Sequence, residues 1–141
     1  MNVGGHAKLI TAAASLVFCG KVLSDIRKVV VAFHYAEKIK SNLIMATNLL
    51  GALSDMNDSE IVGAEKLLKV YFDSLTTEVN IAANASGIYG FEDVRRKLEE
   101  AVRLLKEHNY SEPMKLVAKA MSITTTAANE SAEKLSKKGL I

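Results

Sequence analysis

The sequence predicts an all-α protein, an antiparallel bundle of four to five helices, and three observations lead to this prediction. Apolar residues from Leu9 onward recur at intervals of three and four, which is helical spacing rather than the alternation typical of strands. Only one proline occurs in 141 residues, which argues against a fold rich in turns. The apolar fraction of 49% and the charged fraction of 24% are typical of a globular chain. We therefore expect residues 1–141 to form a single helical-bundle domain.

The clearest predicted element runs from about Val22 to Leu53, a helix of roughly 30 residues that we expect to be the second in the chain. Residues 5–19 form either a separate short helix that bends away at Gly20 or a continuation of this long one. A heptad seam runs along the long helix, made of Val29, Ala32, Ala36, Ile39, Leu43, Ala46, Leu50 and Leu53. A second apolar stripe in its first half predicts burial on two sides there: Leu23, Ile26, Val30 and Phe33.

The next helix is predicted from its two ends. Asn57 and Glu60 have the spacing of a capping box, which opens a helix by pairing its free backbone N–H groups with side chains. Gly87 is placed to close the same helix, because glycine adopts the left-handed conformation that often follows a last turn. Residues 88–90 then form a short connection.

Two further helices complete the predicted bundle. The first spans roughly Phe91 to His108 and carries its apolar residues on one side. The second begins where Ser111 caps the chain and Pro113 stands in the first turn, and it runs to about Lys138. Long helices joined by short connections favour antiparallel packing.

Composition excludes several classes of protein. The single Cys19 cannot form an intramolecular disulfide, and the longest uncharged stretch, Ser41 to Ser54, is shorter than the ~20 residues that cross a bilayer as a helix. We expect a cytoplasmic protein with no membrane partner. The balance of 18 basic and 16 acidic residues gives a net charge of +2, which permits contact with nucleic acid without requiring it.

Metal and cofactor sites are not predicted. The chain has three histidines, at positions 6, 34 and 108, and none stands in a zinc or di-iron pattern. No glycine-rich phosphate loop or nucleophile motif occurs. We therefore expect no metal and no cofactor.

One constellation fits catalysis. Arg103, His108 and Tyr110 have the spacing Arg-x4-His-x-Tyr, which resembles the active-site motif of HEPN-type ribonucleases, small helical proteins that cut RNA as dimers. The resemblance implies that the arginine stabilises charge on the phosphate, the histidine moves protons and the tyrosine contacts the phosphate. Leu104 departs from the family, whose members usually carry a polar residue directly after the arginine.

Basic residues offer a surface for binding phosphate groups, because phosphate binding requires spaced cations. The sequence places them on one strip of the long helix and near the ends of two others. The candidate nucleic-acid contacts are Arg27, His34, Lys38, Arg95, Arg96, Lys97, Lys134, Lys137 and Lys138.

The order of features resembles the small α-helical subunits of archaeal CRISPR interference complexes. The likeness rests on an Ala-rich first helix, the stretch Ser24–Arg27 entering the long helix, the helix start Phe91–Val94, and Ala118–Ile123 near the end. It implies a non-catalytic subunit that stacks in several copies and guides nucleic acid along a basic face.

The leading expectation is therefore a non-enzymatic helical subunit, whose partners are itself or larger protein subunits, with single-stranded RNA or DNA contacted through the basic residues. Long helices with two apolar stripes tend to need partners. The alternatives are the HEPN-like ribonuclease and a small-ligand bundle. A ligand would require a polar group facing a cavity, for which Tyr71, Asn80 and Thr124 are candidates.

Overall fold

The structure, a computed structural model, describes the backbone of residues 3–141 and the side chains of residues 15–17 and 19–141. It contains four helices and, in these residues, no strand: α1 (Val3–Leu53), α2 (Asp58–Ser86), α3 (Tyr89–Lys106) and α4 (Ser111–Lys137). The all-α prediction is confirmed. The long helix is the first in the chain rather than the second, because residues 5–19 continue into it to give one helix of 51 residues.

Gly20 does not end α1, for a simple energetic reason. A glycine inside a helix costs roughly 1 kcal/mol relative to alanine, which is too little to break a long helix without help from a proline. The first proline in the chain is Pro113, and three consecutive alanines precede Gly20 at residues 12–14. Residues 3–53 therefore form one continuous helix.

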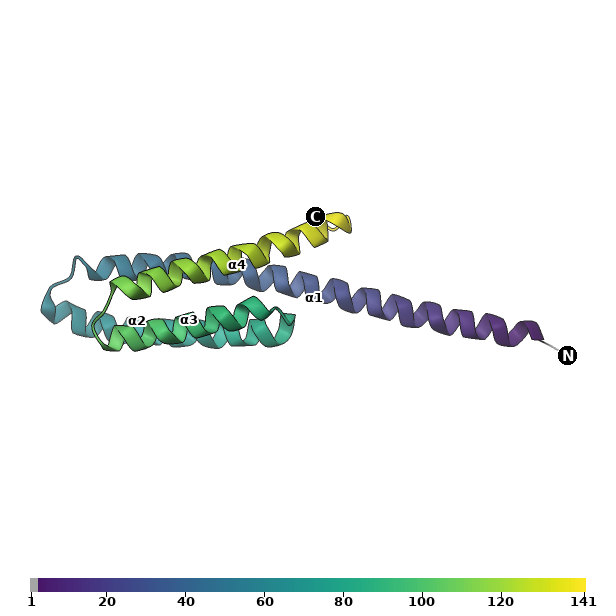
Figure 1. The fold of residues 1–141 in the computed structure, drawn as a ribbon, viewed down its shortest axis with the longest axis horizontal. Coiled ribbons are helices and arrows are strands. Elements are labelled where there is room, and N and C mark those ends of the chain that lie inside the picture. Colours follow the sequence, from purple (N-terminus) through teal and green to yellow (C-terminus); the bar gives the residue numbers. More distant parts are fainter. Residues whose placement is uncertain (1–2) are drawn as a thin grey trace.

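The four helices pack as a ring of antiparallel neighbours (Figure 1). Contacts join α1 to α2 and α4, and α3 to the same two helices. Short connections at residues 54–57, 87–88 and 107–110 reverse the chain between consecutive helices. Short connections leave little alternative to antiparallel packing of neighbours, as expected.

The bundle core lies along the predicted heptad seam of α1. All of its members from Ala32 to Leu53 are buried, and Val29 is half-buried. Alanines at positions 36, 46, 82, 101 and 120 are fully buried and allow the helices to approach one another closely. Phe72 from α2 and Phe91 from α3 are the largest fully buried side chains.

The N-terminal part of α1 projects beyond the other three helices (Figure 1). We call residues 3–31 the arm, because Ala32 is the first buried residue among the described side chains. The predicted burial of the second stripe is wrong: Leu23 is 66% exposed and Val30 46% exposed, and Ile26 and Phe33 are half-buried. This stripe lies roughly a third of a turn away from the core seam, so the rest of the bundle covers it only in part.

The predicted ends of α2 are confirmed. The Asn57 side chain accepts a hydrogen bond from the Glu60 backbone N–H (3.0 Å), and the Glu60 carboxylate accepts one from the Asn57 backbone N–H (3.4 Å). Gly87 has φ 69°, a left-handed conformation, and its N–H donates to the Ala83 carbonyl. Both ends therefore follow from local chemistry that the sequence reveals.

The boundaries of the last two helices differ from prediction. Helix α3 begins at Tyr89 rather than Phe91, because Ile88 already serves as its N-cap. Ser111 is not the cap of α4: the Asn109 side chain accepts the hydrogen bond from the Glu112 N–H (3.2 Å), and Ser111 is the first helical residue. Asparagine performs this role as readily as serine.

Candidate interaction site

The arm carries a row of apolar side chains with a seven-residue repeat. Leu16, Leu23 and Val30 alternate with three others, and we call the six together the arm seam, which passes from the arm into the bundle at its last member: Leu16, Cys19, Leu23, Ile26, Val30 and Phe33. Leu16 is 74% exposed, and Cys19 is also exposed. A repeat of seven with apolar residues at its first and fourth positions is typical of the contact line of a coiled coil.

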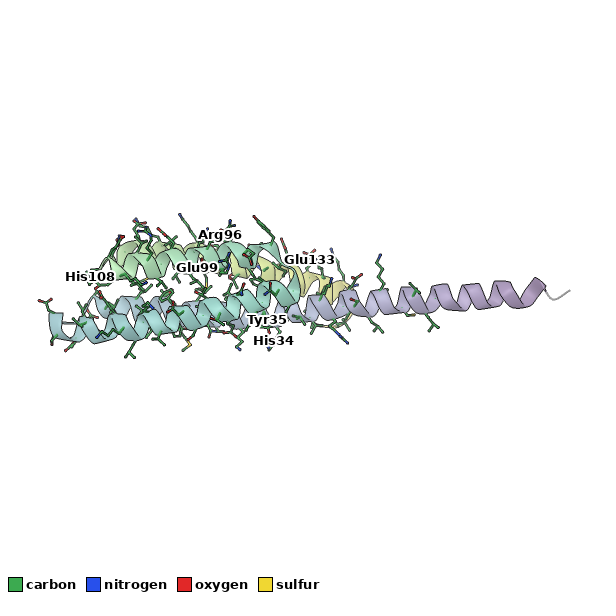
Figure 2. All side chains as sticks on the ribbon, turned by 90° about the horizontal axis from the view of Figure 1, so that it is seen from below. His34, Tyr35, Arg96, Glu99, His108 and Glu133 are labelled. Atoms are coloured by element: carbon green, nitrogen blue, oxygen red, sulfur yellow. The ribbon has the colours of Figure 1, made fainter. Side chains whose placement is uncertain are left out.

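Charged residues of the arm lie mostly off this seam. Lys21, Asp25 and Lys28 occupy positions on the outer side of the seven-residue repeat, and Arg27 flanks the seam. Helices α2 and α3 lie beside the other end of α1, and the C-terminal end of α4 runs beside the part of the arm nearest the bundle, so only the N-terminal part of α1 projects free of all three (Figures 1 and 2). The arm seam is thus an apolar surface flanked by charged residues from Lys21 onward, and four of its six side chains are exposed.

A second apolar surface lies at the opposite end of the bundle, where α1 ends and α2 begins. It is a groove of about 330 Å³, which we call the end groove. Its lining includes Leu49, Leu53, Met56, Leu67, Leu68 and Tyr71. Leu67 is 75% exposed at its edge.

The predicted nucleic-acid contacts fall into separate places. Figure 2 shows His34 and Arg96 on opposite edges of the bundle, so α1 and α3 do not present their cations on one face. Lys38 forms an ion pair with Glu78 of α2, and this contact raises the pKa of Lys38. One continuous basic face, as the leading expectation requires, is not formed by these nine residues.

Several of these cations are neutralised by carboxylates on their own helices. Arg95 lies between Glu92 (2.9 Å) and Glu99 (2.8 Å). Lys97 lies 3.0 Å from Asp93, Arg96 lies 3.9 Å from the same carboxylate, and Lys137 lies 3.0 Å from Glu133. Among the side chains that the structure describes, the candidates without an ion pair are Arg27, His34, Lys134 and Lys138.

The HEPN-like constellation is divided between two sets of contacts. Arg103 is paired with Glu100 and Glu107 on its own helix, where it is 54% exposed. His108 and Tyr110 instead meet Glu65 of α2: the His108 Nδ1–H donates to Glu65 Oε1 (2.8 Å), and the Tyr110 hydroxyl donates to the same oxygen. A carboxylate therefore lies between the histidine that would move protons and the tyrosine that would contact the phosphate.

Glu65 is the residue that sequence reasoning missed. It stands 43 positions before His108 and 45 before Tyr110, and no motif marks it. Its side chain is only 16% exposed. Burial raises the pKa of Glu65, but hydrogen bonds from Tyr110 and His108 outweigh burial, so the pKa is lowered. The same contact, together with burial, raises the pKa of Tyr110 to about 12.

The three polar candidates for a ligand site do not converge. The Thr124 hydroxyl is fully buried and donates to the Ala120 carbonyl (2.8 Å) in its own helix. The Tyr71 hydroxyl donates to the Asn42 carbonyl (2.7 Å), and Asn80 is exposed. Tyr71 alone borders the end groove, and its hydroxyl is already used by the backbone.

Within the described residues, no group of histidine, cysteine, aspartate or glutamate side chains is arranged to hold a metal ion. Nor does any helix in that part of the chain have the length and apolar content needed to cross a membrane. Comparisons of the chain with protein-family models, curated proteins and solved structures found no match.

Proposed function

We propose that this chain is a non-enzymatic helical subunit of a larger cytoplasmic assembly, which attaches to copies of itself or to partner proteins through the arm. The observation that carries the proposal is the exposed arm seam, whose leucines at positions 16 and 23 are 74% and 66% exposed. The same two residues occupy equivalent positions of consecutive repeats.

The free energy of burying apolar side chains favours association through the arm seam. Burying a leucine side chain that is otherwise exposed contributes roughly 1.5–3 kcal/mol, so a row of exposed apolar residues favours association with another surface. Single exposed apolar residues are normal on proteins, whereas contiguous ones mark interaction sites. The arm seam is contiguous along one side of α1, and four of its six side chains are exposed: Leu16, Cys19, Leu23 and Val30.

Nucleic acid is the second part of the proposal. Arg27, His34, Lys134 and Lys138 are the predicted contacts left without an ion pair in the described chain, which limits phosphate binding to a few contacts. Few contacts imply weak binding with a shallow dependence on salt. The resemblance to small subunits of CRISPR interference complexes agrees with a helical, non-catalytic chain that gains affinity when several copies stack.

Two double variants test the assembly. The test variant carries two charges on the arm seam, through Leu16→Glu and Leu23→Glu. The control variant carries the same two charges one residue further along and off the seam, through Val17→Glu and Ser24→Glu. Val17 and Ser24 are both exposed, so neither pair of changes disturbs the core. We expect the first variant to lose self-association and capture of partners, and the second to keep both.

Sedimentation equilibrium measures self-association, and co-purification from native cells measures partner capture. Circular dichroism confirms that both variants keep their helix content. A wild-type chain that is monomeric at high concentration and captures no partner would contradict the proposal. Equal behaviour of the two variants would contradict the role of the seam.

A further inference from the structure

We propose that the occupant of the arm seam is the arm of a second copy, paired with it as an antiparallel two-stranded coiled coil centred near Lys21. This inference rests on the proposed function and names the partner and its direction. In this pairing, Leu16 of one copy lies opposite Ile26 of the other, and Cys19 lies opposite Leu23.

The seven-residue repeat argues that the occupant is a helix. A straight α-helix has 3.6 residues per turn, so a stripe that repeats every seven residues drifts slowly around its axis. A second helix that winds around the first follows such a stripe along its whole length. The six seam residues keep the seven-residue spacing from Leu16 to Phe33.

The arm of a second copy is the helix that fits. Helices α3 and α4 bury most of their apolar side chains within the bundle, the exposed Leu67 of α2 belongs to the end groove, and no other helix reaches the N-terminal end of α1 (Figure 1). A second arm carries the same repeat, so the two seams are complementary to each other. Antiparallel pairing also sets the small Cys19 of each copy against the larger Leu23 of the other. The two pairs of side chains on either side of the centre therefore fill the same volume.

Charge favours the antiparallel direction. The arm is divided: residues 9–20 carry no charge, whereas Lys21, Asp25, Arg27 and Lys28 follow closely. Antiparallel pairing places Asp25, Arg27 and Lys28 beside the uncharged part of the other copy, and Lys21, at the centre, stays on the outer side of the repeat. Parallel pairing would place like charges side by side, and it would bring Glu37, at the next seam position, opposite its own copy.

The surface area is of the right size for this contact. The chain has 8938 Å² of solvent-accessible surface, against about 7,100 Å² for a compact monomer of 15.3 kDa. The excess of about 1,800 Å² exceeds the ~800 Å² that each partner buries in a stable protein–protein interface. Because the arm projects from one end of the bundle (Figure 1), the antiparallel direction also places the two bundles at opposite ends of the paired arms.

Disulfide cross-linking tests the direction. Leu23→Cys in the otherwise native chain places a second cysteine opposite Cys19 of the other copy, so mild oxidation should convert monomer to a reducible dimer on a denaturing gel. In the native chain, the two Cys19 residues would be offset by about one helical turn along the pair in addition to the separation between the two helices, which puts their Cα atoms beyond the ~7 Å that a disulfide spans. Ser24→Cys, exposed and off the seam, is the matched control and should not cross-link.

A second cysteine design is needed because Leu23→Cys removes a leucine from the arm seam and could weaken the pairing that it tests. Leu16→Cys with Ile26→Cys, combined with Cys19→Ser, should cross-link in the same way. Efficient cross-linking of native Cys19, or equal cross-linking of Ser24→Cys, would overturn the inference. A dimer in sedimentation that neither cysteine design cross-links would also overturn it while leaving the proposed function intact. A monomer that captures no partner would overturn both.

Discussion

Tyr110, in the connection before α4, donates its hydroxyl hydrogen to the carboxylate of Glu65 on α2. His108 in the same connection donates to the same oxygen, although it adopts the left-handed conformation with φ 61°. Figure 2 shows His108 at the end of the bundle far from the arm. The contact therefore fastens the α3–α4 connection to a helix that is distant in sequence.

Tyr110→Phe should lower the free energy of unfolding by about 1.5–3 kcal/mol, the range for a hydrogen bond to a charged group, because the half-buried carboxylate of Glu65 loses a donor. Urea denaturation at neutral pH measures the loss. Tyr89→Phe is the control, since Tyr89 is 76% exposed and should change stability by less than about 0.5 kcal/mol. Equal effects of the two variants would show that the contact with Glu65 does not stabilise the fold.

The contact also predicts a dependence on pH. The pKa of Glu65 in the folded chain lies below its ordinary value of 4.5, so the unfolded chain binds this proton more readily. Stability from Glu65 is therefore fully present above pH 4.5 and is lost as the pH falls through the folded-state pKa.

The measurement is the free energy of unfolding between about pH 6 and pH 3 for native chain and Glu65→Gln. The native chain should lose more stability over this range than the variant, which has no carboxylate to protonate. Parallel curves for the two proteins would contradict the lowered pKa.

The features that could be predicted from the sequence are those that depend on residues close together in the chain. The heptad seam from Ala32 to Leu53 predicted the core side of α1, and the Asn57 capping box predicted where α2 begins. The exposure of Leu23 could not be predicted, because an apolar stripe does not reveal whether its partner belongs to the same chain. Glu65 escaped for a related reason: its contacts depend on how α2 packs, which no spacing in the sequence encodes.

Two glycines in α2 and at its end should respond in opposite directions to alanine. Gly87 has φ 69°, a conformation that costs a residue with a side chain roughly 1–2 kcal/mol, so Gly87→Ala should destabilise the chain by about that amount. Gly63 lies inside α2 with open space around it, so Gly63→Ala should stabilise the chain by up to about 1 kcal/mol through helix propensity. Thermal unfolding of both variants checks the signs, and two shifts in the same direction would contradict the assignment of these helix positions.

The proposed contact with nucleic acid predicts a graded response to loss of cations. One double variant, Lys134→Gln with Lys138→Gln, removes two cations that have no ion pair in the described chain. The slope of the logarithm of the RNA-binding constant against the logarithm of salt concentration should then become shallower by about 1.4, since each contact with single-stranded RNA contributes about 0.7. Lys97→Gln with Lys137→Gln removes two cations already paired to Asp93 and Glu133, so its effect should be smaller. Fluorescence anisotropy at several salt concentrations measures both slopes, and equal slopes for the two variants would show that ion pairing does not decide which lysines bind.

The ribonuclease alternative predicts a different outcome, and the contacts of Glu65 argue against it. A phosphate that approached His108 and Tyr110 would meet the negative charge of Glu65, whereas catalysis of phosphate transfer requires positive charge there. Arg103, which would supply that charge, is held by Glu100 and Glu107. We therefore expect native chain to leave labelled single-stranded RNA intact in a gel assay. Cleavage by native chain that disappears in both Arg103→Ala and His108→Ala, with helix content and RNA affinity unchanged, would instead establish an enzyme, because changes that spare both fold and binding can abolish cleavage only by removing catalytic groups.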